Sequence, residues 1–129
     1  MKSVIFALSL ILGTSAMAAN TSLFKCVVPS DTKAVTVNID IGDDASADFV
    51  TVTLNEKSGA STFFSQNDKG SVNTQIQAGN FNMLALTEKS AQVDGVIQSS
   101  GFLALASSNN AFSGFLAANG NIYPLQCTH

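Results

Sequence analysis

In the stretch Ala34-Val35-Thr36-Val37-Asn38-Ile39-Asp40-Ile41, large apolar side chains occupy every second position and alternate with Ala34, Thr36, Asn38 and Asp40. Successive side chains of a β-strand point to opposite faces, so this period of two predicts a strand with one buried and one solvated face. The same alternation recurs at 48–55 and 72–78, and no segment after residue 18 has the apolar repeat of a helix. The sequence therefore predicts an all-β fold.

Short clusters of Gly, Asn, Asp, Ser and Pro separate the alternating segments and predict turns, with Asn119-Gly120 the strongest hairpin signal. The strands expected between them lie at 23–28, 34–41, 48–55, 61–65, 72–78, 81–87, 91–98, 101–106, 111–118 and 122–127. Because every connection is too short for a helical crossover, we predict a single small antiparallel meander of about 8–10 short strands.

Residues 1–18 have the features of a secretory signal peptide. Lys2 gives a positive start, Val4–Leu12 is an apolar run, and Ala16-Met17-Ala18 places small residues where a signal peptidase cleaves. Apolar residues make up 46% of the sequence, enough for one domain of this size to bury a core. We therefore expect a signal peptide over 1–18 and a single β domain over 19–129, in a periplasmic or secreted protein.

The two cysteines, Cys26 and Cys127, lie near the ends of this domain. In an exported protein an even pair predicts a disulfide, and free thiols or a two-ligand metal site are the alternatives. A disulfide requires Cα atoms roughly 4.4–6.8 Å apart, so the first and last strands must lie close together. That condition favours a closed β-barrel, with a β-sandwich as the alternative.

The C-terminal third contains a repeat, because Ser100-Gly101-Phe102-Leu103-Ala104 returns as Ser113-Gly114-Phe115-Leu116-Ala117. Gly95, Gly101 and Gly114 fall in or beside these strands, where glycine marks a bend or a close backbone approach. The strands are apolar on both faces, through Phe102, Leu103, Leu105, Phe112, Phe115 and Leu116. We expect these side chains to fill the barrel; a cavity for a small apolar ligand and an exposed docking patch are the alternatives.

The charge balance excludes several partners. The net charge is −3 with no arginine, and removing Lys2 leaves five lysines against nine acidic residues, or −4. Such a domain repels nucleic acid and anionic lipid surfaces. No second apolar stretch approaches the roughly 18–20 residues of a spanning helix, so we expect no membrane insertion. The remaining partners are an unknown protein or a small apolar ligand.

No catalytic constellation stands out. The one histidine, His129, is the last residue, where we expect a frayed terminus. Asp40, Glu56, Glu88 and Asp94 are the candidates for a carboxylate-based hydrolase, but each fits a solvated strand face or turn equally well. The chain is therefore expected not to be an enzyme and to need no cofactor.

The segment 40–48 is the most acidic, with Asp40, Asp43, Asp44 and Asp48. Four carboxylates in nine residues could gather ligands for calcium, but the spacing differs from the EF-hand loop and the late bidentate glutamate is missing. We interpret the segment as a solvated hairpin loop and expect no metal site.

Phe24-Lys25-Cys26 near the start and Leu125-Gln126-Cys127 near the end resemble the layout of periplasmic inhibitors of lysozymes and metalloproteases. Those are small exported barrels whose terminal strands are joined by a disulfide. Ser58-Gly59-Ala60 is similar to an inhibitory loop of the lysozyme inhibitors, without the aromatic and basic residues around it. The likeness covers a layout and a tripeptide, and assigns the chain to no family.

The sequence thus favours a non-catalytic exported binding module. Inhibition of a hydrolase, either a lysozyme or a protease, is one alternative, and a carboxylate-based hydrolase is the other.

Overall fold

The computed structural model describes residues 20–87, 92–93, 96–97 and 100–129, so the expected signal peptide lies outside it. The described residues form ten strands and one helix. In chain order these are β1 (Asn20–Val27), β2 (Thr36–Gly42), β3 (Ala47–Glu56), β4 (Gly59–Asp68), α2 (Ser71–Gln77), β5 (Asn80–Thr87), β6 (Gln92–Val93), β7 (Val96–Ile97), β8 (Ser100–Ser108), β9 (Ala111–Ala118) and β10 (Asn121–Thr128).

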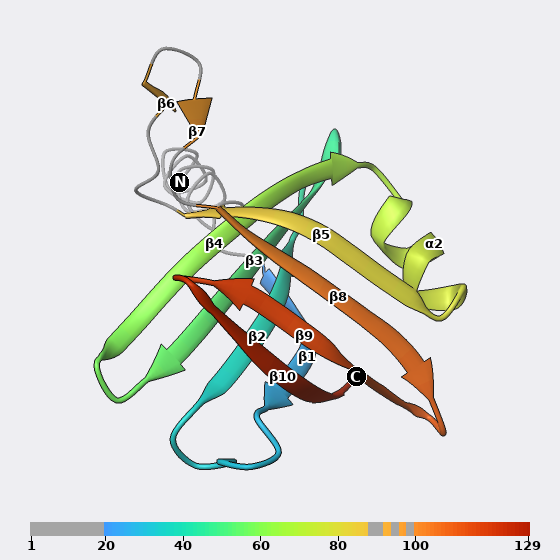
Figure 1. The fold of residues 1–129 in the computed structure, drawn as a ribbon. Coiled ribbons are helices and arrows are strands. Elements are labelled where there is room, and N and C mark those ends of the chain that lie inside the picture. Colours follow the sequence, from blue (N-terminus) through green and yellow to red (C-terminus); the bar gives the residue numbers. More distant parts are fainter. Residues whose placement is uncertain (1–19, 88–91, 94–95, 98–99) are drawn as a thin grey trace, which may run out of the picture.

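Eight of these strands form one antiparallel barrel in the order β1-β10-β9-β8-β5-β4-β3-β2 (Figure 1). Barrel strands that follow one another in the chain are paired, and β1 pairs with β10 to close the barrel. β6 and β7 lie outside the barrel and pair only with each other. The strand expected at 91–98 is therefore two short strands as far as it is described. The predicted all-β meander is confirmed, and of the two architectures considered the structure is the barrel.

The barrel interior is a packed apolar core. Inward positions follow the period of two seen in the sequence, as in β3, where Val50, Val52 and Leu54 are fully buried and the residues between them are partly exposed. The largest fully buried side chains are Phe24, Phe63, Phe81, Ile39, Leu54, Leu103 and Leu116. Burial of apolar side chains contributes roughly 25 cal/mol per Å², which makes this core the main source of stability.

Two hairpins are closed by two-residue turns whose backbone requires left-handed φ values. Asn119 and Gly120 have φ of 54° and 78°, and Asn109 and Asn110 have φ of 52° and 66°. Positive φ at both central residues defines a type I′ turn, whose twist matches that of the flanking strands. The predicted Asn119-Gly120 hairpin is confirmed as the connection between β9 and β10.

The barrel closes between its first and last strands over a very short seam. β1 and β10 pair only through Lys25–Val27 with Gln126–Thr128. Cys26 lies directly opposite Cys127 at the centre of this seam, and the two form a disulfide with a Cα–Cα distance of 4.0 Å. The predicted bond between the terminal strands is confirmed, and it reinforces a ladder of only three residue pairs.

A second narrow seam lies between β4 and β5, which pair only at Phe63 with Thr87 and Phe64 with Leu86. Beyond these pairs the two strands separate, and α2, which connects them, packs against both (Figure 1). Val72 of this helix is buried in the core and Ile76 packs against it. α2 thereby covers one end of the barrel, opposite the end with the β3–β4 turn.

The strand predicted over 72–78 is wrong, because this segment is α2. Val72 and Ile76 are four residues apart. That spacing puts them on one face of a strand, whose period is two, and also on one face of a helix, where residues i and i+4 are neighbours. Asp48 of β3 decides between the two: its Oδ2 accepts hydrogen bonds from the backbone N–H groups of Gly70 at 3.0 Å and Val72 at 3.2 Å. A carboxylate at a helix N-terminus satisfies free N–H groups and complements the helix dipole.

Gly114 permits a close approach of backbones inside the barrel wall. A Cβ at this position would lie 1.8 Å from the carbonyl oxygen of Ala104 in the neighbouring strand β8. Gly101 is less restricted, because its Cβ would lie 3.0 Å from the Ala117 carbonyl oxygen. The expectation that Gly101 and Gly114 mark close approaches is confirmed, and Gly95 lies outside the described residues.

Gly114→Ala is expected to lower the free energy of unfolding by about 3 kcal/mol or more, because β8 and β9 must separate to admit the methyl group. Gly42→Ala is the control, since the one tight contact of its Cβ would be the end of the Asn20 side chain at 3.2 Å, and Phe49 would lie at ordinary contact distance, 3.7 Å or more. That change is expected to cost less than about 1 kcal/mol. Chemical denaturation measures both values, and equal losses would contradict the close approach.

Replacing both Cys26 and Cys127 with serine is expected to lower the free energy of unfolding by about 4–5 kcal/mol, the chain-entropy value for a loop near 100 residues. Their separation is 101 residues. Denaturant titration of the double variant and of the oxidised protein measures the difference. A loss below about 1 kcal/mol, or two reactive thiols in natively exported protein, would show that packing alone holds the seam.

Candidate functional site

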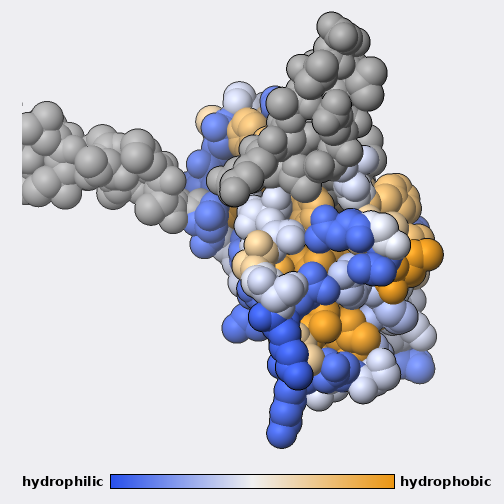
Figure 2. Space-filling view, turned by 60° about the vertical axis from the view of Figure 1, so that its left-hand side comes forward, coloured by the Kyte–Doolittle hydropathy of each residue, from blue (hydrophilic) through white to orange (hydrophobic). Residues whose placement is uncertain are grey.

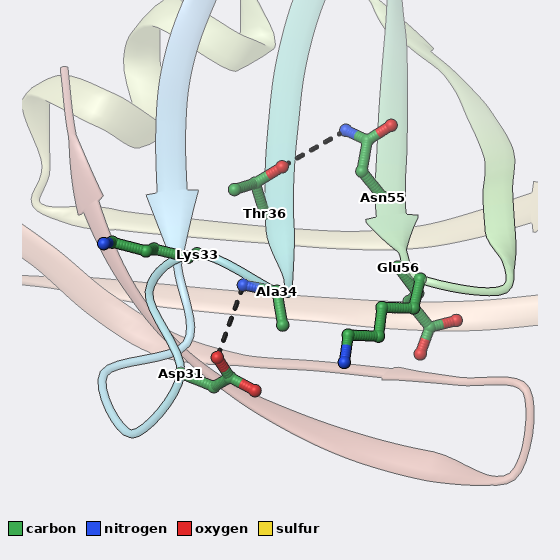
Figure 3. A pocket seen from close by; sticks show the side chains of 7 residues that line it. Asp31, Lys33, Ala34, Thr36, Asn55 and Glu56 are labelled. Carbon is green, nitrogen blue, oxygen red and sulfur yellow. Dashed lines mark hydrogen bonds between the residues drawn. The ribbon is translucent and has the colours of Figure 1, made fainter.

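A hollow of about 560 Å³ opens at the end of the barrel opposite α2 (Figure 3). Its lining comes from the loop between β1 and β2, the first residue of β2, the end of β3 and the turn after β3. We call these residues the rim: Asp31, Lys33, Ala34, Thr36, Asn55, Glu56 and Lys57.

The β1–β2 loop is held in shape by its own hydrogen bonds. Asp31 donates its backbone N–H to the Val28 carbonyl oxygen at 2.8 Å, and its Oδ1 accepts from the Ala34 N–H at 3.3 Å (Figure 3). The side chain of Asn55 donates to Thr36 Oγ1 at 3.3 Å, which joins β3 to the end of this loop. The rim is therefore preorganised on rigid strands.

Tyr123 joins the rim to the opposite wall of the barrel. This buried residue of β10 donates its hydroxyl to Glu56 Oε1 at 2.7 Å, and the Asn121 side chain donates to the same hydroxyl at 3.3 Å. Burial, and after it the hydrogen bond to the Glu56 carboxylate, raise the pKa of Tyr123 above its ordinary value. Sequence analysis missed this residue, although it alternates with the buried Leu125 and Cys127 and so falls on the inward face.

Ser58-Gly59-Ala60, which we call the tip, lies at the β3–β4 turn: Ser58 is in the turn beside the rim residue Lys57, and Gly59 and Ala60 begin β4 opposite Glu56 and Asn55. All three residues are exposed. Gly59 has a φ of 140°, and a Cβ there would meet no atom within 4 Å. The strands of this hairpin pair continuously from Ala47 with Asp68 to Glu56 with Gly59, so the tip lies at the exposed end of a firm support.

The rim carries both signs of charge, through Asp31, Glu56, Lys33 and Lys57. Among the described residues the one ion pair within 4 Å is between Lys69 and Asp48, at the other end of the barrel. Within that part of the chain, the ammonium groups of Lys33 and Lys57 have no carboxylate within 4 Å.

The candidate catalytic carboxylates do not come together where they are described. Asp40 lies opposite Thr51 in the β2–β3 ladder, five positions before Glu56 on β3. At about 3.3 Å per residue the two backbones are about 16 Å apart along the strand, whereas glycosidase carboxyl groups lie about 5–9.5 Å apart. Glu88 and Asp94 fall outside the described residues, so no pair that includes them is tested.

Two of the four aspartates in segment 40–48, Asp44 and Asp48, have different hydrogen-bond partners. Asp44 Oδ1 accepts from the Ser46 hydroxyl and backbone N–H at 2.6 and 2.7 Å, which holds the pKa of Asp44 below its ordinary value. Asp48, only 4% exposed, faces α2. The described residues contain no group of three His, Cys, Asp or Glu side chains placed to hold a metal ion; the expectation of no metal site stays a prediction.

His129 is not frayed, contrary to expectation. Its ring packs against Phe24 with centroids 5.1 Å apart, and against Phe112 at 6.5 Å. Phe24 in turn contacts Phe81 and Phe112 inside the barrel. The sequence offered no signal for this contact, because it depends on the β1–β10 seam bringing the chain end back over Phe24.

The apolar C-terminal residues divide between the two faces of the barrel wall. Leu103, Leu105, Phe112 and Leu116 fill the interior as expected. Phe102 and Phe115 instead point outward and are 42% and 37% exposed. The alternation within β8 and β9 explains this division, since both faces of these strands carry apolar residues. On the face shown in Figure 2, apolar groups likewise form separate patches among polar side chains.

Compared with known proteins, the chain matches no family model, no curated protein and no solved structure. Within the part of the chain that the structure describes, no helix has the length and apolar character needed to cross a lipid bilayer.

The chain contains a single tyrosine, so the tyrosinate absorbance reports Tyr123 directly. Its midpoint is expected above 10.0, the ordinary value. The folded state then keeps the proton that the unfolded state releases, so this residue's stabilising contribution is present below pH 10 and is lost as the pH rises through the folded pKa. Glu56→Gln is expected to lower the midpoint; a wild-type midpoint at or below the ordinary value would contradict the buried hydrogen bond.

Proposed function

We propose that this protein is a non-catalytic binding module that recognises another protein through the rim and the adjacent tip Ser58-Gly59-Ala60. The observation that carries the proposal is the exposed tip beside a hollow of mixed charge. Loops held by a rigid scaffold are where binding residues concentrate, and a preorganised surface lowers the entropy cost of association.

A protein partner fits this site better than a small apolar ligand. Such a ligand would need an internal apolar cavity, but the core positions are filled by side chains such as Phe24, Phe63 and Phe81, which are fully buried. The rim hollow lies at the surface and is lined largely by polar and charged side chains. Lysines and carboxylates at an interface steer the approach of a partner and select its orientation.

The disulfide supports an oxidising environment for the folded protein. Together with the signal peptide expected over 1–18, this supports export, to the periplasm or outside the cell. The partner is then a protein of the same compartment or one that enters it.

Inhibition of a hydrolase is a second candidate function. The geometry that favours it is the exposed turn at the tip, which stands clear of other atoms at Gly59. An exposed turn on a rigid hairpin is suited to entering a cleft, because little ordering is needed on binding.

A pull-down from the host cell envelope with residues 19–129, the expected mature protein, tests the proposal. Ala60→Arg places a large cation at the tip, and Ala45→Arg is the matched control in the exposed loop between β2 and β3, at the other end of β3. The wild type and Ala45→Arg are expected to capture the same partner, and Ala60→Arg to lose it.

Capture that Ala60→Arg does not reduce would contradict the rim as the binding site, and no capture from the host envelope or medium would contradict the proposal as a whole. If the partner is a hydrolase, its activity with and without the wild type decides the second candidate. Undiminished activity at saturation would exclude inhibition.

A further inference from the structure

The outer face of β8 and β9 carries an aromatic ridge. In the ladder Phe102 lies opposite Ala117, Leu103 opposite Leu116, and Ala104 opposite Phe115. The two leucines point inward and are buried, so the outward side of this unit consists of two phenylalanines on one diagonal and two alanines on the other. The phenylalanine rings lie 6.1 Å apart between centroids and form one ridge with a small residue on either side.

The Ser-Gly-Phe-Leu-Ala repeat produces this pattern. Because its two copies pair antiparallel about the Leu103–Leu116 position, a local two-fold axis perpendicular to the sheet relates Phe102 to Phe115 and Ala104 to Ala117. The repeat therefore builds a face with approximate two-fold symmetry.

Such a face is self-complementary. A two-fold rotation about an axis that lies in the face and runs parallel to the strands exchanges the two diagonals, so a second copy presents its phenylalanines to the alanines of the first. A hollow of about 300 Å³ lies on the Ala117 side, lined in part by Ala117 and Ile122, the latter 71% exposed. This hollow offers space for an aromatic side chain of the facing copy.

The distribution of charge also favours a second copy of this chain as the partner of the β8–β9 face. No charged residue occurs from Ser100 to Thr128, although the whole chain has a net charge of −3. Two copies of an acidic protein repel each other wherever their carboxylates approach. The β8–β9 face, with Ile122 and Pro124 of β10 beside it, lets them meet without bringing charged side chains together or removing charges from water.

We propose that the outer face of β8–β10 is a symmetric interface that binds a second copy of this chain, with Phe102 and Phe115 at its centre. Closed two-fold contacts of this kind are isologous, so each interface residue contributes once from each copy and a single substitution changes the interface at two places. The interface shares no residue with the rim.

Light scattering or sedimentation of the mature protein tests the interface. Because the apolar patch is small, we expect a reversible change from one chain to two between about 1 µM and 1 mM, the range of weak interfaces. Phe102→Glu is expected to weaken association at least about tenfold, because each dimer would bury two unpaired carboxylates against apolar surface. Phe115→Glu is expected to do the same from the symmetry-related position.

Phe64→Glu is the matched control. Phe64 is 43% exposed, like Phe102, but lies on β4, two strands and hence a quarter turn around the eight-stranded barrel from β8. It is expected to associate as the wild type does. Circular dichroism of the three variants verifies the fold, and mixing Phe102→Glu with Phe102→Lys is expected to restore association that neither variant shows alone.

A wild type that remains a single chain over the whole concentration range would overturn the proposal, as would equal weakening by Phe64→Glu or a mixture of charged variants that fails to associate. A monomeric wild type whose capture of another protein is abolished by Phe102→Glu would assign the face to a different partner and likewise overturn it.

Discussion

The closure of the barrel between β1 and β10 is the constraint on which the rest of the structure depends. An eight-stranded sheet without that closure would expose two edges, yet the two strands share only a three-residue ladder. The Cys26–Cys127 bond crosses this ladder at its centre. It fixes where β1 ends, and so where the β1–β2 loop with Asp31 and Lys33 begins, and it brings His129 over Phe24.

Polar contacts then fix the two ends of the barrel. At one end, buried Asp48 binds the N-terminus of α2 and holds the helix between the separated strands β4 and β5. At the other end, Tyr123 and Glu56 connect β10 to the rim. Buried hydrogen bonds to charged groups are among the stronger ones, so both ends are firm supports. The barrel then carries its surface features in two places, a charged rim and an uncharged outer face.

Periodicity alone predicted much of this fold from the sequence, because strands such as β2 and β3 are buried on one side only. It failed at 72–78, because the spacing of Val72 and Ile76 fits a strand and a helix equally well. The helix is favoured by the carboxylate of Asp48, which is distant in the sequence. Asp48 lies two residues before Val50 and four before Val52, so the period of two places it on their buried face. The acidic composition of segment 40–48 led instead to its interpretation as part of a solvated loop. At the site, Glu56 and the Ser58-Gly59-Ala60 tip were singled out, but the loop facing them and the Tyr123 contact depend on barrel closure.

Residue-resolved amide hydrogen exchange on the oxidised protein and on the Cys26→Ser/Cys127→Ser variant tests the role of closure most directly. If the disulfide holds the short seam, the amides of β1 and β10 lose protection in the variant, together with those of the β1–β2 loop, while the β3–β4 hairpin keeps its protection. Unchanged protection in β1 and β10, or a uniform loss across the whole barrel, would contradict this account of how the fold is closed.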